Sequence, residues 1–130
     1  MSIENSFIGK AIVHGHEENF FALISNADVN LQDDNTSLLT LALLNRQFVM
    51  ADALVKEGAT LNYCNRRNIP IAIIVAKTIQ TKKDADIFKA WFENNNVNLS
   101  EKFTEYGLNY TFNNIVYDNL KKHSKSNMIL

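Results

Sequence analysis

The sequence has little of what disulfide-bonded folds and many enzyme sites require. It contains one cysteine, one proline and four glycines in 130 residues. The lone Cys64 excludes an internal disulfide framework and is typical of a reducing compartment, so we expect a cytoplasmic protein. So few glycines argue against a glycine-rich phosphate-binding loop, and neither a G-x-S-x-G nor an H-E-x-x-H motif occurs. We therefore expect that the chain is not an enzyme.

A strong excess of charge and a long hydrophobic run are also missing. The formal net charge is -1 and the sequence pI is about 6.3, whereas binding to nucleic acid through bulk charge needs a basic face. No apolar run reaches the ~18 residues of a membrane-spanning helix. The beginning of the sequence lacks a basic segment followed by an apolar one, which would indicate a signal peptide. We expect no nucleic-acid partner, no membrane association and no processing.

What the sequence does contain is a five-residue phrase that recurs three times. It occupies residues 26–30, 58–62 and 94–98. The aliphatic residue of each phrase keeps a regular spacing, with 32 positions from Val29 to Leu61 and 36 from Leu61 to Val97. A recurrence of this length is typical of stacked supersecondary units. Each phrase also follows a short apolar run with helical character, so the sequence predicts repeated pairs of helices.

The run from 69 to 76 is the one ambiguous segment among these helices. Its residues are mostly β-branched, and such a run can form a buried strand. The repeat spacing favours a helix, in which Asn68 is the cap and Pro70 lies in the first turn, where its missing N–H costs nothing. Farther along, we expect a turn at Gly107 and an amphipathic helix from about Tyr110 to Leu120.

These residues carry a family resemblance. The unit of a turn, two antiparallel helices and the ending Ala27-Asp28-Val29-Asn30 resembles the ankyrin repeat over most of the chain. The ankyrin helix opening T-P-L-H-x-A corresponds to residues 37–42, where Thr40 replaces the histidine. The resemblance implies an all-α, ankyrin-like solenoid of stacked helix-turn-helix repeats, with about three full units plus a partial C-terminal cap. It would form a single domain over residues 1–125, with a loose tail at 126–130.

The resemblance also implies that the chain binds another protein through a concave surface and its turns, as a stoichiometric adaptor or inhibitor. A bacterial immunity protein that neutralises a toxin is one such role, and a host-directed ankyrin effector is an alternative. We single out Arg66 and Arg67, because guanidinium groups bind carboxylates through two hydrogen bonds. The expected protein-binding residues are Asp33, Asp34, Asn35, Thr40, Asn45, Asn65, Arg66, Arg67, Asn68, Lys77, Glu101 and Lys102.

This interpretation includes no metal and no cofactor. The alternative from another class is a metal-dependent sensor or enzyme that uses His14, His16 and Glu17, because two imidazoles and a carboxylate can bind zinc. Cys64 has two interpretations as well. It is either a nucleophile activated by a neighbouring group or, because free cysteines are often buried, a small apolar residue between repeat units.

Overall fold

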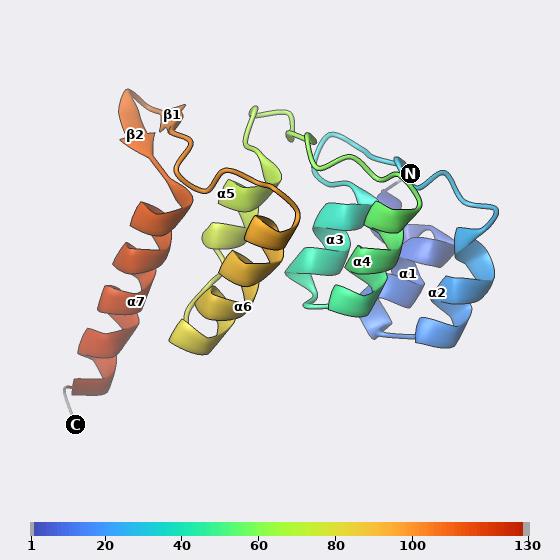
Figure 1. Ribbon diagram of the computed structural model, residues 1–130, viewed down its shortest axis with the longest axis horizontal. Coiled ribbons are helices and arrows are strands. Elements are labelled where there is room, and N and C mark those ends of the chain that lie inside the picture. Colours follow the sequence, from blue (N-terminus) through green and yellow to red (C-terminus); the bar gives the residue numbers. More distant parts are fainter. Residues whose placement is uncertain (1, 129–130) are drawn as a thin grey trace. The chain divides into compact units, whose positions relative to one another are not determined.

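The computed structural model describes residues 2–128, with side chains described as far as His123. The chain divides into two compact units, unit 1 (residues 1–68) and unit 2 (residues 69–130). Within residues 2–128 there are seven α-helices, one short 3-10 helix and one two-stranded antiparallel sheet (Figure 1). The prediction of an all-α, ankyrin-like solenoid is therefore wrong, and the fold is a mixed one dominated by helices.

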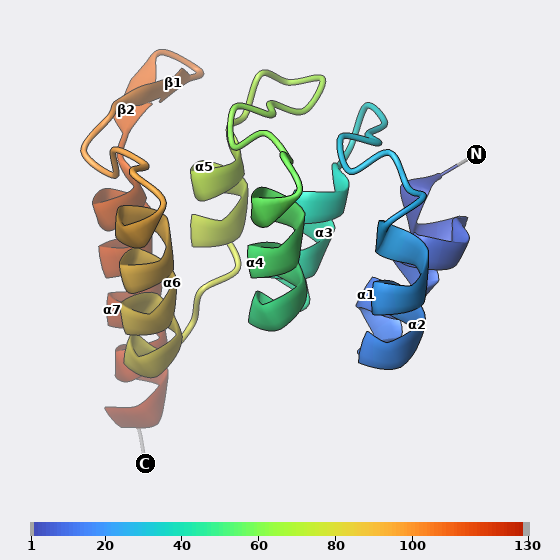
Figure 2. The same cartoon turned by 45° about the vertical axis from the view of Figure 1, so that its right-hand side comes forward.

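Unit 1 consists of two helical hairpins. The first contains α1 (Phe7–His14) and α2 (Glu17–Ile24), preceded by the 3-10 helix η1 (Ile3–Asn5). The second contains α3 (Leu38–Leu44) and α4 (Phe48–Lys56). The hairpins lie side by side, with α1 against α3 and α2 against α4 (Figures 1 and 2). The helix connections at one end are tight, and the longer loops project at the other end.

Local chemistry explains where these helices begin and end. Ser6 and Ser37 cap α1 and α3, because each side-chain oxygen accepts a hydrogen bond from the backbone N–H three residues later, at 3.0 and 3.1 Å. The tight connections pass through left-handed residues at equivalent positions, Gly15 with φ 68° and Arg46 with φ 56°. Glycine adopts this conformation without strain, and arginine does so at a cost.

The core of unit 1 is centred on α3. The sequence predicts that this helix is apolar nearly all round and must be covered on several sides, and this is confirmed: residues 38–43 are all buried. Met50 and Leu54, four residues apart on α4, are also buried, as are Ile12 and Phe20 of the first hairpin. Unit 1 thus folds around apolar contacts between its two hairpins.

Unit 2 has three helices and the sheet. Its elements are α5 (Ile71–Ala76), α6 (Lys82–Asn94), β1 (Phe103–Glu105), β2 (Leu108–Tyr110) and α7 (Phe112–Met128). The helical prediction for the run from 69 to 76 is confirmed by α5. Helix α5 packs against α7, where the Asn119 side chain donates to the Ala76 carbonyl at 3.1 Å. An aromatic cluster fills the core, with Phe92 edge-on to Phe112 at 5.7 Å between ring centroids.

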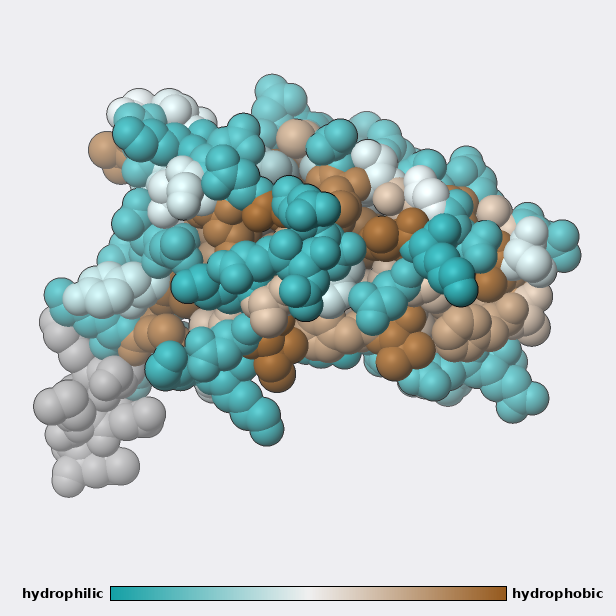
Figure 3. Space-filling view, viewed as in Figure 1, coloured by the Kyte–Doolittle hydropathy of each residue, from teal (hydrophilic) through white to brown (hydrophobic). Residues whose placement is uncertain are grey.

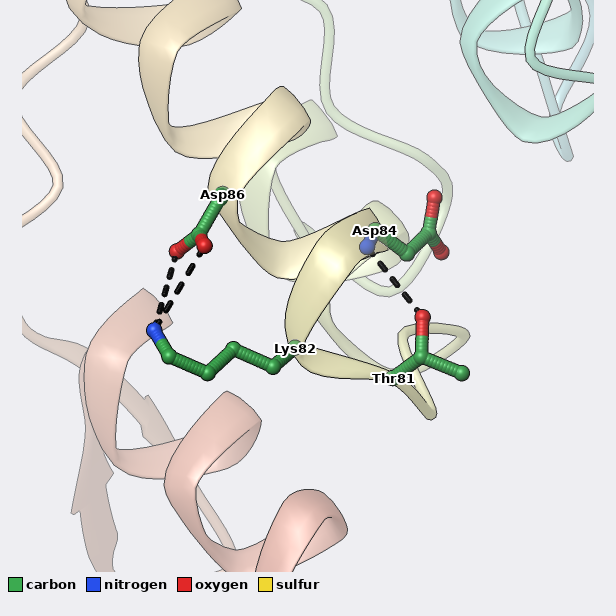
Figure 4. A network of polar contacts seen from close by, with 4 residues as sticks. All are labelled: Thr81, Lys82, Asp84 and Asp86. Carbon is green, nitrogen blue, oxygen red and sulfur yellow. Dashed lines mark hydrogen bonds and ion pairs between the residues drawn. The ribbon is translucent and has the colours of Figure 1, made fainter.

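The beginning of α5 differs in detail from the prediction, and α6 has a side-chain cap. Pro70 is the N-cap residue rather than part of the first turn, and Asn68 has left-handed φ 61° instead of capping. In α6 the cap is Thr81, whose Oγ1 accepts from the Asp84 N–H at 3.1 Å (Figure 4). Lys82, in the first turn, forms an exposed ion pair with Asp86 at 3.4 Å (Figure 4).

The antiparallel hairpin β1–β2 precedes the last helix, and its tip lies at Gly107, where a turn is expected. Tyr106 and Gly107 form its tip, with φ 53° and 77°, a pair of positive values that matches the right-handed twist of a two-residue hairpin. Tyr110 lies in β2, so the helix begins at Phe112. Helix α7 extends to Met128, inside the segment 126–130 for which we expect a loose tail, and residues 129–130 lie outside the described part.

Candidate functional site

Seven of the expected binding residues of unit 1 lie on two projecting loops, the first loop (residues 31–37) and the second loop (residues 57–68). Asp33 organises the first loop. Its carboxylate accepts hydrogen bonds from three backbone N–H groups, those of Asn35 at 2.8 Å, Thr36 at 2.9 Å and Ile3 at 3.1 Å. The last of these bonds ties the loop to η1. Asp33 therefore uses its carboxylate to shape the loop, although we expected it to contact a partner.

The pKa of Asp33 reflects this arrangement. Partial burial by itself raises the pKa, but the hydrogen bonds from Ile3, Asn35 and Thr36 favour the ionised form more strongly. The net result is a pKa below its ordinary value. The carboxylate is therefore negatively charged at neutral pH.

The two loops are joined to each other by hydrogen bonds. The Arg66 N–H donates to the Asp34 carbonyl at 2.8 Å, and the Tyr63 hydroxyl donates to the Asp33 carbonyl at 3.1 Å. Tyr63 is only 4% exposed. Burial, and then the charges of Asp33, Asp34 and Cys64, raises the pKa of Tyr63, so its hydroxyl stays protonated and can donate. The loops consequently behave as one ordered surface.

A second connection uses the recurring phrase itself. The Asn30 side chain accepts from the Thr60 N–H at 2.8 Å and donates to the Gly58 carbonyl at 3.2 Å. The last residue of the first phrase is thus hydrogen-bonded to the second phrase. Asn30 and Tyr63 are not among the binding residues expected from the sequence. A signal for Asn30 does exist, because asparagine ends all three phrases, at positions 30, 62 and 98.

Arg66 and Arg67 are exposed on the second loop. The Arg67 N–H donates to the Asn65 side chain at 2.9 Å, and Asn68 follows in the left-handed conformation, so the local backbone is well defined. Among the residues that the structure describes, no carboxylate forms an ion pair with either guanidinium. Both groups are free to bind a carboxylate supplied by another molecule.

Two further expected binding residues of unit 1, Thr40 and Asn45, belong to α3 and its C-cap and not to the loops. Thr40 is 0% exposed, and its hydroxyl lies 2.8 Å from the Ser37 hydroxyl at the beginning of α3, so this expected binding residue is not accessible to a partner protein. Asn45 is half-buried, and its side chain donates to the Leu41 carbonyl at 2.8 Å, which stabilises the end of α3. The hydrogen bonds of both side chains therefore lie within α3 and its caps.

The remaining expected residues, Lys77, Glu101 and Lys102, are exposed in unit 2. Lys77 forms an ion pair with Glu105 at 3.2 Å and so connects the end of α5 to β1. Glu101 and Lys102 precede β1. The structure brings together the expected residues of the two unit 1 loops. Lys77, Glu101 and Lys102 belong to unit 2 and are not part of that surface.

His14 and His16 flank the connection between α1 and α2, with ring centroids 5.7 Å apart. No group of three or more histidine, cysteine or acidic side chains arranged to hold a metal occurs within the described residues. Glu17 therefore does not complete a set of ligands with the histidines. The thiol of Cys64 is exposed, so the expectation that it is a buried residue between units is wrong.

The surface combines polar loops with apolar patches. Figure 3 shows hydrophobic surface among hydrophilic side chains over α2 and α4 of unit 1. Phe21 and Val49 are two exposed apolar residues of these helices. In the described part of the chain, no helix has the length and hydrophobicity to cross a membrane.

The chain was also compared with known proteins. Neither a protein-family model nor a curated protein matches it. The resemblance to ankyrin repeats gains no support from these comparisons.

Proposed function

We propose that the chain is a protein-binding module without catalytic activity, which acts as a stoichiometric adaptor or inhibitor. Its binding site is the paired-loop surface, defined as Asp34 and Asn35 of the first loop with Arg66 and Arg67 of the second. The observation that carries the proposal is the hydrogen bond of 2.8 Å from the Arg66 N–H to the Asp34 carbonyl, which holds the two loops together. The exposed Cys64 supports a reducing compartment, and we place the interaction in the cytoplasm.

The order of the loops favours binding because association has an entropic cost. A mobile loop loses conformational freedom when it binds, whereas these loops are held by internal hydrogen bonds before any partner arrives. Two guanidinium groups on such a surface, with no ion pair among the described residues, recognise an acidic patch of a partner protein, since each arginine can bind a carboxylate with two parallel hydrogen bonds.

The test uses charge reversal of the two arginines. Tagged wild-type chain and the Arg66→Glu/Arg67→Glu variant are used to isolate complexes from the source cells, with quantitative mass spectrometry of the bound proteins. The control is Lys83→Glu/Lys89→Glu, which makes the same change in net charge at two exposed positions of α6. We expect a protein that is bound by the wild type and by the control but lost with the arginine variant. Equal recovery with all three would refute the paired-loop surface.

A further inference from the structure

The first hairpin of unit 1, α1–α2, carries both an exposed aromatic anchor and a groove. Phe7, at the beginning of α1, is 83% exposed. Beside it, a groove of about 370 Å³ runs between α1 and α2, with Ala11, Ala22 and Leu23 in its lining. Buried Ile8 and Ile12 occupy a different side of α1, where the helix contributes to the core. The second hairpin lies to one side of α1 and α2 (Figure 2).

Anchor and groove therefore lie on the same face of the same hairpin. A twofold-symmetric interface requires this combination, because each protomer must present both the inserting group and the site that receives it. Phe7 itself forms one wall of the groove. When two such faces meet, the ring of each Phe7 covers the apolar lining of the opposite groove and loses its own exposure to water.

The charges on this face are also self-complementary. Lys10 lines the groove and no carboxylate does so. Glu18 stands one helical turn before Ala22, on the same side of α2. Both are exposed, and neither forms an ion pair within the described part of the chain. A second copy in antiparallel orientation brings the acid of one protomer toward the cation of the other.

We propose that the chain forms a twofold-symmetric dimer in which Phe7 of each protomer inserts into the α1–α2 groove of the other. This inference does not rest on the proposed function, because the paired-loop surface is formed by other residues. The dimer interface would cover a face of the hairpin that otherwise exposes Phe7 and an apolar groove to solvent.

The test is sedimentation equilibrium of the purified full-length chain from low to high micromolar concentration. We expect a reversible monomer–dimer equilibrium for the wild type. Phe7→Ala removes the anchor, and Ala22→Trp fills the groove. Because each dimer contains two Phe7 contacts, either variant should weaken dimerisation by about 100-fold or more. Val49→Ala, at a 55% exposed position of α4, is the matched control and should leave the equilibrium unchanged.

Mixing the two variants distinguishes a symmetric interface from unspecific association. A Phe7→Ala chain loses its own Phe7 wall but keeps the rest of the groove lining, including Ala11, Ala22 and Leu23, and an Ala22→Trp chain keeps its anchor. A heterodimer therefore retains one of the two contacts that both homodimers lack. The mixture should dimerise more strongly than either variant alone. A monomeric wild type at every concentration, which would indicate that something other than a second copy covers the groove, overturns the proposal. So does a dimer that neither Phe7→Ala nor Ala22→Trp weakens.

Discussion

The hydroxyl of Tyr63 donates a hydrogen bond to the carbonyl oxygen of Asp33, which lies 30 positions earlier in the sequence, at 3.1 Å. A nearly buried phenol on the second loop is thereby connected to the backbone of the first loop. This contact and the Arg66–Asp34 bond hold together two segments that local sequence signals treat as separate turns.

Tyr63→Phe tests the contribution of this contact. The substitution keeps the ring and removes only the hydroxyl, so the free energy of unfolding should fall by about 1 kcal/mol. Urea unfolding measures the change. Tyr117→Phe is the matched control, because Tyr117 is exposed on α7 and its substitution should have little effect. An equal loss in both variants would contradict a specific role for the Tyr63 hydroxyl.

The lowered pKa of Asp33 should make the free energy of unfolding depend on pH. Its folded pKa lies below its ordinary value, so the unfolded chain binds the proton more readily. The stabilisation is therefore fully present above the unfolded pKa of about 3.9 and is lost as the pH falls through the lowered folded pKa. Asp33→Asn should make unfolding less dependent on pH across this acidic range.

The measurement for Asp33 is the free energy of unfolding between about pH 6 and about pH 3. Asp34→Asn provides the control, because the Asp34 carboxylate accepts no hydrogen bond from the first loop. The same pH dependence in wild type and Asp33→Asn would show that this carboxylate is not the group responsible.

Asn30 offers a comparison between equivalent residues of two phrases. Its side chain makes two hydrogen bonds to the second phrase, at Gly58 and Thr60, whereas the exposed side chain of Asn62 makes none within the described residues. Asn30→Ala should lower the free energy of unfolding by about 1–2 kcal/mol, and Asn62→Ala by much less. Faster hydrogen exchange at the Thr60 amide in Asn30→Ala would identify the lost contact directly.

A substitution at the tip of the β-hairpin should stabilise the fold. Tyr106 holds a positive φ of 53°, which a bulky residue adopts at a cost, and 83% of its surface is exposed. Asparagine tolerates this conformation, and Asn-Gly is the preferred pair in two-residue hairpins. Tyr106→Asn should raise the free energy of unfolding by about 0.5–1 kcal/mol, measured by thermal unfolding. A lower stability would mean that the exposed ring packs in a way that the hairpin geometry does not indicate.

The helices could largely be predicted because their signals are local. Apolar spacing in residues 38–44, the acidic beginning of α2 and the position of Gly58 after α4 all depend on neighbouring residues. The β-hairpin was not predicted, although Gly107 separates two short segments that contain the β-favouring aromatic residues Phe103 and Tyr110. Strands of three residues are too short to show a clear two-residue period, and the expected repeat favoured a helix.

The candidate site could be predicted only as a set of polar loop residues. The loops follow from composition, because asparagine, aspartate and arginine between apolar helices favour exposed turns. Whether a given residue is accessible depends on the tertiary packing, which buries Thr40 inside α3 and leaves Arg67 exposed on the second loop.

The sequence by itself determined most of the helical segments and the recurring phrase, because these depend on interactions between residues a few positions apart. The tertiary structure decided that Asp33 shapes a loop, that Asn30 and Tyr63 join successive turns and that Phe7 remains exposed beside a groove. Each of these outcomes depends on groups that are distant in the chain and meet only when the helices pack.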